Sequence, residues 1–271
     1  MPKAEAALWS RLKDQKKLIL IAGPCVVENE ALCFRIAASL QKTCAALGIQ
    51  YVFKASYDKA NRSSGQSFRG PGLEEGLDVL GRIREKLGVP VLTDVHDSAQ
   101  AMRAAETVDI LQIPAFLCRQ TDLIQSAVET GRIVNIKKGQ FLSPLEMEQV
   151  IKKAQGFGAK RLLITERGTT FGYNNLVADM RAIPIMKRFG VPVIFDATHS
   201  VQLPGGAGDR SSGQSEFAPV LARCAVAAGA NGLFLETHPV PSQALSDGPN
   251  MIPVKDMRQL LASLLRIREA L

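Results

Sequence analysis

The stretch Ile133–Gly168, IVNIKKGQFLSPLEMEQVIKKAQGFGAKRLLITERG, holds one complete strand–helix–strand unit. Its two ends, IVNIKKG and RLLITERG, are short apolar runs of the kind that form strands buried on both faces. Between them Ser143 precedes Pro144, and Glu146 follows, which is typical of a helix N-terminus. The stretch therefore predicts two parallel strands joined by a helix over 144–157.

The same alternation of apolar runs and amphipathic segments extends over most of the 271 residues. The strand-like runs are Leu18–Cys25, Tyr51–Ser56, Pro90–Val95, Ile110–Phe116, Ile133–Gly139, Arg161–Gly168, Pro192–His199 and Gly232–His238. The helix-like segments are Asn29–Leu47, Leu73–Leu87, Ser98–Glu106, Asp122–Thr130, Pro144–Phe157, Asn174–Phe189, Glu216–Ala228 and Val254–Leu271.

Eight strand-like runs that alternate with eight helix-like segments predict the α/β class and a single (β/α)8 barrel, the TIM-barrel fold. An open doubly wound sheet is the structural alternative, but no GxGxxG turn follows the first strand-like run. We expect one domain over residues 1–271, in which residues 1–17 are an N-terminal extension.

The composition narrows the classes of ligand and the compartment. Lys and Arg number 33 against 26 Asp and Glu, which gives a net charge of +7. Basic residues never run beyond two in a row, and aromatic residues make up only 6%, so a small anionic ligand is favoured over nucleic acid. Five cysteines without framework spacing indicate a reducing compartment. Since neither an apolar run of about 18 residues nor a signal-peptide pattern is present, we expect a cytoplasmic protein that does not bind a membrane.

Polar side chains gather at the ends of the strand-like runs, where a TIM barrel carries its chemistry. The residues at these ends are Cys25, Lys54, Asp94 with His96, Gln112, Lys137 with Lys138, Glu166 with Arg167, Asp196 with His199, and Glu236 with His238. All three histidines of the chain are among them. This grouping predicts an active site at one mouth of the barrel.

Four of the candidate residues suggest a metal site. Cys25, His199, Glu236 and Asp247 belong to the first, seventh and eighth strands and to the loop after the eighth, which are neighbours in a closed barrel. A thiolate, an imidazole and two carboxylates suit a divalent ion such as Zn²⁺, Fe²⁺ or Mn²⁺. The alternative is structural: Cys25 as a small buried apolar residue, and Glu236 in an ion pair with a lysine of the rim.

Basic residues form a second group near the same mouth. Their positions are Lys54, Lys59, Arg62, Arg119, Lys137 and Arg167. Six cations directed at one cavity are costly unless they bind phosphates or carboxylates of a ligand. Solvated surface charges are the alternative, and Lys137 is also placed to act as a Schiff-base lysine, as in barrel aldolases.

A set of longer motifs resembles one enzyme family. The segments LILIAGPC, FKASYDKANRSS, LTDVH, LQIPAFLCRQTDL, NIKKGQF, TERG, FDATHSVQ, FLETHP and SDGPNMIP occur in this order between Leu18 and Pro253. Together they resemble the 3-deoxy-D-manno-octulosonate 8-phosphate synthases. The related 3-deoxy-D-arabino-heptulosonate 7-phosphate synthases typically read Lys-Pro-Arg where this chain has Lys59-Ala60-Asn61-Arg62-Ser63, so they match less well.

The resemblance implies an activity and an assembly. Members of the family are homotetrameric (β/α)8 barrels that condense phosphoenolpyruvate with D-arabinose 5-phosphate and water. They release inorganic phosphate and supply the lipopolysaccharide inner core. The resemblance also implies the metal-dependent branch, because the metal-free branch carries Asn where this chain has Cys25.

The resemblance further implies roles for individual residues. Phosphoenolpyruvate is expected to contact Lys54, Lys59, Gln112, Lys137 and Arg167. Open-chain arabinose 5-phosphate is expected to contact Asn61, Arg62, Ser63 and Asp94, while Arg119 reaches the sugar phosphate in a neighbouring subunit. The metal ligands are expected to be Cys25, His199, Glu236 and Asp247, and the catalytic residues Lys59, Lys137, His199, Asp247 and Cys25.

Four other functions remain open at this point. They are heptulosonate synthesis from erythrose 4-phosphate, a Schiff-base aldolase reaction at Lys137, phosphate binding without catalysis, and nucleic-acid binding through the positive charge.

Overall fold

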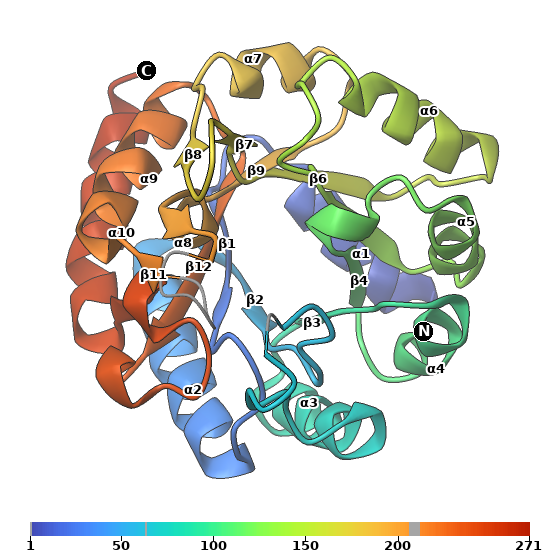
Figure 1. Ribbon diagram of the computed structural model, residues 1–271, viewed down its shortest axis with the longest axis horizontal. Coiled ribbons are helices and arrows are strands. Elements are labelled where there is room, and N and C mark those ends of the chain that lie inside the picture. The colour runs from blue at the N-terminus through green and yellow to red at the C-terminus, as the bar shows by residue number, and fades with distance from the viewer. Residues whose placement is uncertain (1, 63, 206–211) are drawn as a thin grey trace.

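The chain forms the (β/α)8 barrel that its sequence predicts (Figure 1). The computed structural model describes residues 2–62, 64–205 and 212–271. The barrel strands are β1 (Ile19–Gly23), β2 (Gln50–Lys54), β3 (Val91–Asp94), β4 (Ile110–Ile113), β5 (Ile133–Lys137), β6 (Leu162–Glu166), β9 (Val193–Asp196) and β12 (Gly232–His238). They pair in parallel in this order, and β12 pairs with β1 to close the ring. Each strand-like run of the sequence therefore coincides with one barrel strand, although β2 begins one residue before its run, at Gln50.

Helices surround the barrel strands (Figure 1). They are α2 (Glu30–Leu47), α3 (Leu73–Leu87), α4 (Ser98–Ala105), α5 (Thr121–Glu129), α6 (Met147–Gly156), α7 (Ala182–Lys187), α9 (Ala218–Ala227) and α10 (Val254–Glu269). Their apolar faces pack on the outward-pointing strand residues and form the larger hydrophobic core. Within the described residues, no helix is long and apolar enough to cross a membrane.

The expected helix over Asn174–Phe189 is wrong in its first half. Thr169–Thr170 (β7) pairs with Leu176–Val177 (β8) in an antiparallel hairpin that extends from the end of β6. Asn174 has a φ of 54°, in the left-handed region, so a right-handed helix does not begin there. Only α7 remains helical in this segment.

The strand expected over Pro192–His199 also ends early, at Asp196. A short helix, α8 (Ala197–Ser200), follows because the Asp196 carboxylate accepts a hydrogen bond from the His199 backbone N at 2.9 Å. In the helix expected over Pro144–Phe157, Ser143 and Glu146 form reciprocal hydrogen bonds, and α6 begins one residue after Glu146.

Several short elements complete the carboxyl end of the barrel and its loops. They are β10 (Gln202–Leu203), β11 (Ser212–Gly213), β13 (Ile252–Pro253) and the 3-10 turns Ala115–Leu117, Ser215–Phe217, Pro241–Gln243 and Gly248–Asn250.

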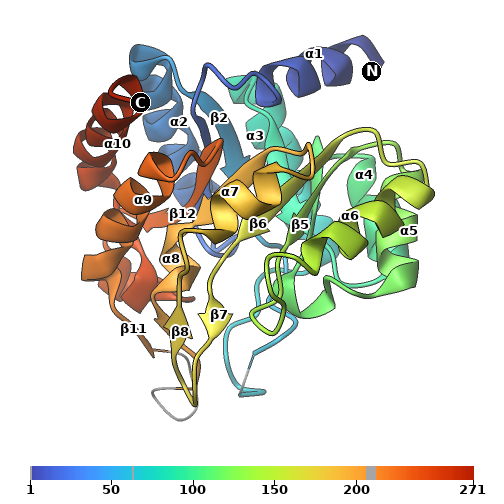
Figure 2. The same ribbon diagram turned by 90° about the horizontal axis from the view of Figure 1, so that it is seen from above.

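The N-terminal extension contains a helix, α1 (Pro2–Leu12), that lies across one end of the barrel. Figure 2 shows α1 at the end opposite the β7–β8 hairpin. Leu8 and Leu12 pack in one cluster with the inward-pointing residues of the barrel strands, including Ile21 and Phe234. The extension therefore closes the amino-end mouth and leaves the carboxyl-end mouth open.

We predict that Leu12→Ala destabilises the protein by about 2–5 kcal/mol, because Leu12 is only 1% exposed and its loss leaves a cavity beneath the barrel. Leu145→Ala is the matched control, since Leu145 is 63% exposed. Urea unfolding followed by circular dichroism measures both. Equal midpoints for the two variants would contradict a packing role for α1.

Candidate active site

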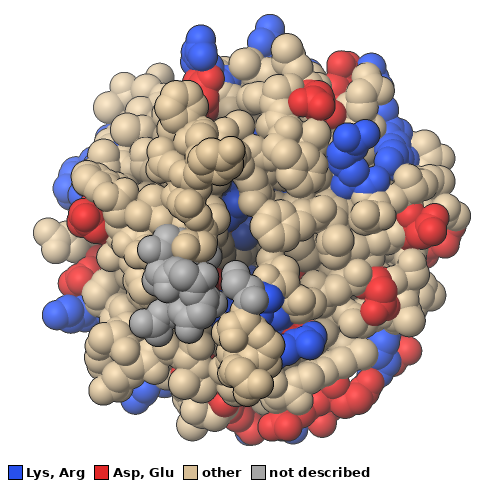
Figure 3. Space-filling model, in the orientation of Figure 1, with Lys and Arg blue, Asp and Glu red and all other residues tan. Residues whose placement is uncertain are grey.

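A cavity of about 760 Å³ opens at the carboxyl ends of the barrel strands. Figure 3 shows basic side chains inside the hollow at the centre of this face. The sequence-predicted residues that line it are Lys54, Lys59, Asn61, Arg62, Asp94, Gln112, Lys137, Arg167, His199 and Asp247. Cys25 and Glu236 are fully buried and contact residues of this lining. Ser63 lies outside the described residues.

Three of the four candidate metal ligands come together where β12 closes on β1, and His199 lies beside two of them. The register pairs Gly23 with Glu236, which brings Cys25 close to Glu236 across the seam. Donor atoms of Cys25, Glu236 and Asp247 all lie within 4.8 Å of one another. His199 Nε2 lies 3.6 Å from Glu236 Oε1 and 4.0 Å from Asp247 Oδ2.

Two features of this cluster suit a divalent cation. Glu236 Oε2 is buried and has no hydrogen-bond partner among the described residues. Burial, with Asp247 and Glu236 nearby, raises the pKa of the Cys25 thiol well above its usual range. The thiol donates to Asp247 Oδ2 at 3.1 Å, so the protein alone keeps it protonated. A bound cation is the kind of charge that would ionise it and occupy the free carboxylate oxygen.

Two lysines partly neutralise the same carboxylates. Lys54 Nζ donates to Cys25 O at 2.8 Å and to Glu236 Oε1 at 3.3 Å. Lys59 Nζ lies 4.0 Å from Glu236 and 3.9 Å from Asp247. Although burial alone would lower the pKa of Lys59, the Glu236 and Asp247 carboxylates raise it above its ordinary value. Lys59 is therefore held as a cation at the cavity wall, and Lys54 is hydrogen-bonded to Glu236 beside it.

Lys137 has a different partner, Asp196. Lys137 Nζ lies 2.5 Å from Asp196 Oδ2 and 3.9 Å from the centre of the Phe234 ring. Burial lowers the pKa of Lys137, and Asp196 counteracts this. Burial would raise the pKa of Asp196, but His199 and Lys137 together hold it well below its usual range. Asp196 Oδ2 also lies 2.7 Å from His199 Nδ1 and so fixes the imidazole ring of this candidate metal ligand.

Arg167 forms no ion pair with a carboxylate of the described chain. Its Nη2 donates to Gln202 Oε1 at 3.0 Å and to the His199 carbonyl oxygen at 3.5 Å. Burial lowers the pKa of this guanidinium from its ordinary value. A buried cation with only neutral acceptors favours an anionic ligand beside it.

A hydrogen-bonded group on β2 and β3 lines the other side of the cavity. Ser56 Oγ donates to Asp94 Oδ1 at 2.5 Å, and His96 Nε2 lies 3.2 Å from Asp94 Oδ2. Burial would raise the pKa of Asp94, but His96 and Lys54 lower it well below its usual range. The sequence places His96 at the end of a strand-like run, but it is not among the substrate-binding residues that the resemblance implies. Gln202 and Ser246 also line the cavity and carried no signal in the sequence.

Arg119 does not line this cavity. Its side chain is exposed on the connection between β4 and α5, and its carbonyl oxygen accepts a hydrogen bond from Lys153 Nζ at 3.0 Å. Its expected contact with a neighbouring subunit stays a prediction.

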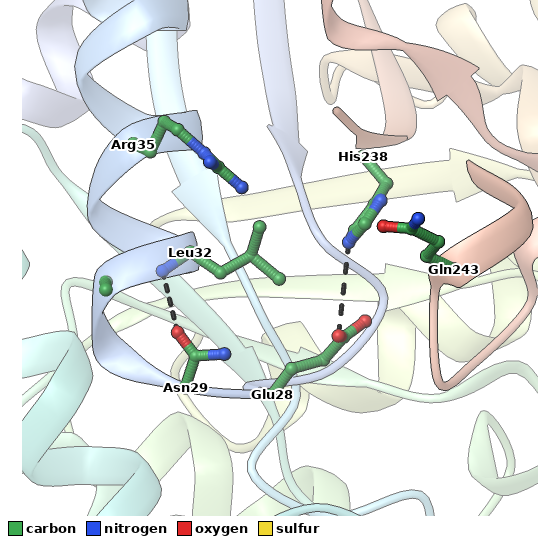
Figure 4. Close-up of a pocket in the computed structure, with 7 residues that line it drawn as sticks. Glu28, Asn29, Leu32, Arg35, His238 and Gln243 are labelled. Carbon is green, nitrogen blue, oxygen red and sulfur yellow. Dashed lines mark hydrogen bonds and ion pairs between the residues drawn. The ribbon is translucent and has the colours of Figure 1, made fainter. Parts of the chain in front are cut away.

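His238 faces a second cavity, of about 470 Å³, between α2 and the loop after β12 (Figure 4). Its Nε2 lies 3.9 Å from Glu28 Oε2. Glu28 Oε1 also accepts a hydrogen bond from Leu245 N at 3.1 Å, two residues before Asp247. His96 and His199 thus line the large cavity, whereas His238 lies beside Glu28 at the second cavity.

Comparison with known proteins places this chain in a family. Residues 11–271 match the DAHP synthetase I family. This chain belongs to that family. A relative from Synechococcus sp. is 60% identical over 257 residues, which are 95% of this chain and 90% of the relative. One from Acidithiobacillus ferrooxidans is 59% identical over 253 residues, 93% of this chain and 90% of the relative.

A further relative, from Geobacter metallireducens, is 57% identical over 254 residues, 94% of this chain and 93% of the relative. All three proteins carry the name 2-dehydro-3-deoxyphosphooctonate aldolase. The resemblance to the 3-deoxy-D-manno-octulosonate 8-phosphate synthases, which the sequence motifs indicated, is therefore confirmed.

For this DAHP synthetase I family member we predict that Glu28→Ala speeds amide hydrogen exchange in residues 244–248 by about tenfold, since one loop hydrogen bond is lost. Glu28→Gln keeps an acceptor oxygen for Leu245 N and should leave exchange close to that of the wild type. Glu30→Ala, on the first turn of α2, is the surface control. Equal exchange in Glu28→Ala and the wild type would show that another contact holds this loop.

Proposed function

We propose that this protein condenses phosphoenolpyruvate with D-arabinose 5-phosphate and water, giving 3-deoxy-D-manno-octulosonate 8-phosphate and inorganic phosphate. The proposal rests on relatives that are 57–60% identical over more than nine-tenths of the chain and share one name. The observation of the site that supports it best is the mouth of the barrel, where cations and a cluster of metal-ligand side chains line one cavity.

Both substrates are anions, and the cavity is lined by the cations Lys54, Lys59, Arg62, Lys137 and Arg167. In our proposal Lys59, Lys137 and Arg167 hold the phosphate and carboxylate of phosphoenolpyruvate, with Lys54 and Gln112 close by. Asn61, Arg62, Ser63 and Asp94 bind the open-chain sugar phosphate, and Arg119 reaches the sugar phosphate in a neighbouring subunit. Fixing two anions face to face removes much of the entropic and electrostatic cost of their encounter.

The reaction joins C3 of phosphoenolpyruvate to the aldehyde carbon of the sugar. Water adds at C2 of the former enol, phosphate leaves from that carbon, and the aldehyde oxygen takes up a proton. Asp196 fixes Nδ1 of His199, so Nε2 is the ring nitrogen that either binds a metal ion or, without one, holds or passes a proton. Asp247 is the second candidate for proton handling, as its carboxylate lies at the cavity wall.

We also propose that the enzyme belongs to the metal-dependent branch. Cys25, His199, Glu236 and Asp247 would hold a divalent ion such as Zn²⁺, Fe²⁺ or Mn²⁺, and the unpartnered Glu236 oxygen supports this. When bound, such an ion supplies Lewis acidity toward a water or an aldehyde oxygen. We further propose that the protein is a cytoplasmic homotetramer and that residues 1–271 form one domain. In this proposal it acts in lipopolysaccharide inner-core synthesis.

A Schiff-base aldolase is the second candidate, because burial lowers the pKa of Lys137. Its close ion pair with Asp196 argues against it, since a Schiff base needs a neutral amine.

The first test is phosphate release from phosphoenolpyruvate in the presence of each candidate sugar phosphate. We expect rapid release with arabinose 5-phosphate and at most slow release with erythrose 4-phosphate. Borohydride added to the same mixtures should leave Lys137 unmodified. Preference for erythrose 4-phosphate would assign heptulosonate synthesis, and a borohydride-trapped adduct at Lys137 would assign the aldolase.

We predict that a chelator removes most of this activity and that added metal restores it. Cys25→Ala should bind a divalent ion at least about 100-fold more weakly and lose most activity, because it removes a direct ligand. Cys25→Asn should keep part of the activity without metal, as the resemblance to the metal-free branch implies. Ion content by mass spectrometry and initial rates measure these effects, with Cys224→Ala as the control at an exposed cysteine. Full activity of metal-free wild-type protein would remove the ion from the mechanism.

A further inference from the structure

Lys138 is a fully buried lysine that does not line the substrate cavity. It follows Lys137 directly at the end of β5, and successive residues of a strand point to opposite faces. Lys137 therefore faces the cavity, and Lys138 faces the space between β5 and β6 and their loops. A buried lysine is costly unless its ammonium group is hydrogen-bonded, so its partners identify what it does.

The ammonium group of Lys138 binds oxygens from two loops. Its Nζ donates to the carbonyl oxygens of Leu142 at 3.0 Å and Gly168 at 3.1 Å, and lies 3.2 Å from Thr169 Oγ1 and 3.3 Å from Gly139 O. Residues 139–142 follow β5, and residues 168–169 follow β6. One cation thus links the first turns of two neighbouring strand-to-helix connections.

Glu166, at the end of β6, completes the arrangement. Its Oε1 lies 3.5 Å from Lys138 Nζ and accepts hydrogen bonds from the backbone N atoms of Arg167 at 3.0 Å and Gly168 at 2.6 Å. Burial lowers the pKa of Lys138 and raises that of Glu166, and each group counteracts the shift of the other. The charges of the ammonium and the carboxylate balance each other, and backbone groups contact both of them.

The residues next to this pair in the chain are the two cations that we assign to phosphoenolpyruvate. Lys137 precedes Lys138, and Arg167 follows Glu166. The loops are tied once more by the Thr170 N to Gln140 O hydrogen bond at 2.9 Å. An apolar pair of similar volume would fill the same space at a lower desolvation cost. The charged pair instead fixes backbone carbonyls and amides in one geometry.

We propose that Lys138 and Glu166 are positioning residues, which set the spacing between Lys137 and Arg167 for an oxyanion group of phosphoenolpyruvate. This inference rests on the proposed function, because it assigns that substrate to these two cations. It predicts that loss of the ammonium link weakens phosphoenolpyruvate binding more than sugar phosphate binding, since Arg62 follows β2 and Asp94 ends β3.

The test compares three variants with the wild type in steady-state kinetics and thermal unfolding. Lys138→Met alone leaves the Glu166 carboxylate buried without its cation and should unfold at a clearly lower temperature. The double variant Lys138→Met/Glu166→Gln removes both charges and should recover much of that stability. Glu166→Gln alone keeps the ammonium link to the loop oxygens. Lys160→Met, at an exposed lysine, is the control.

We expect the double variant to raise the KM for phosphoenolpyruvate by about tenfold or more, because displacements of about 1 Å already cost that much. Its KM for arabinose 5-phosphate should change by less than about twofold. Glu166→Gln should raise the KM for phosphoenolpyruvate by less than the double variant does, because it keeps the ammonium link to the loop oxygens. A double variant with a wild-type KM for phosphoenolpyruvate, or with both constants raised equally, overturns the positioning role. Absence of phosphate release by the wild type would instead overturn the proposed function.

Discussion

The pairing of β12 with β1 is the constraint on which the candidate site depends. Cys25 and Glu236 are far apart in the chain, and only closure of the barrel brings them into contact. The same closure directs the ends of all eight strands at one mouth, while α1 fills the opposite end with Leu8 and Leu12. The barrel topology thus determines which face of the molecule carries the site, whatever the individual side chains are.

Closure also forces charges out of water, and they are stable there only when they are paired. Lys54 binds Glu236, and Lys137 binds Asp196, which in turn fixes His199. Two groups at the mouth remain without full compensation among the described residues: Glu236 Oε2 and the Arg167 guanidinium; away from the cavity, Glu166 Oε2 beside Lys138 also has no hydrogen-bond partner. Glu236 Oε2 suits a cation and Arg167 suits an anion, so the mouth offers binding groups of opposite sign.

The barrel was predictable because each strand and most helices repeat a local pattern of apolar residues, as the stretch from Ile133 to Gly168 does. The mouth residues were predictable for the same reason, since strand ends such as Lys54 and Asp94 meet on one rim. The β7–β8 hairpin was not predictable, because it depends on the left-handed turn at Asn174. The contacts of Glu28 with Leu245 and of Lys138 with Gly168 join distant loops, and such contacts leave no periodic signal in a sequence.

The central claim is that the seam between β1 and β12 binds one divalent ion with Cys25 as a thiolate ligand. Titration with Co²⁺ tests it directly, because a thiolate bound to Co²⁺ gives a charge-transfer absorption in the near ultraviolet. The account predicts that this band grows until about one ion per chain is bound and that it is missing in Cys25→Ala. A wild-type protein that binds Co²⁺ without the band, or a Cys25→Ala variant that retains it, would contradict the account.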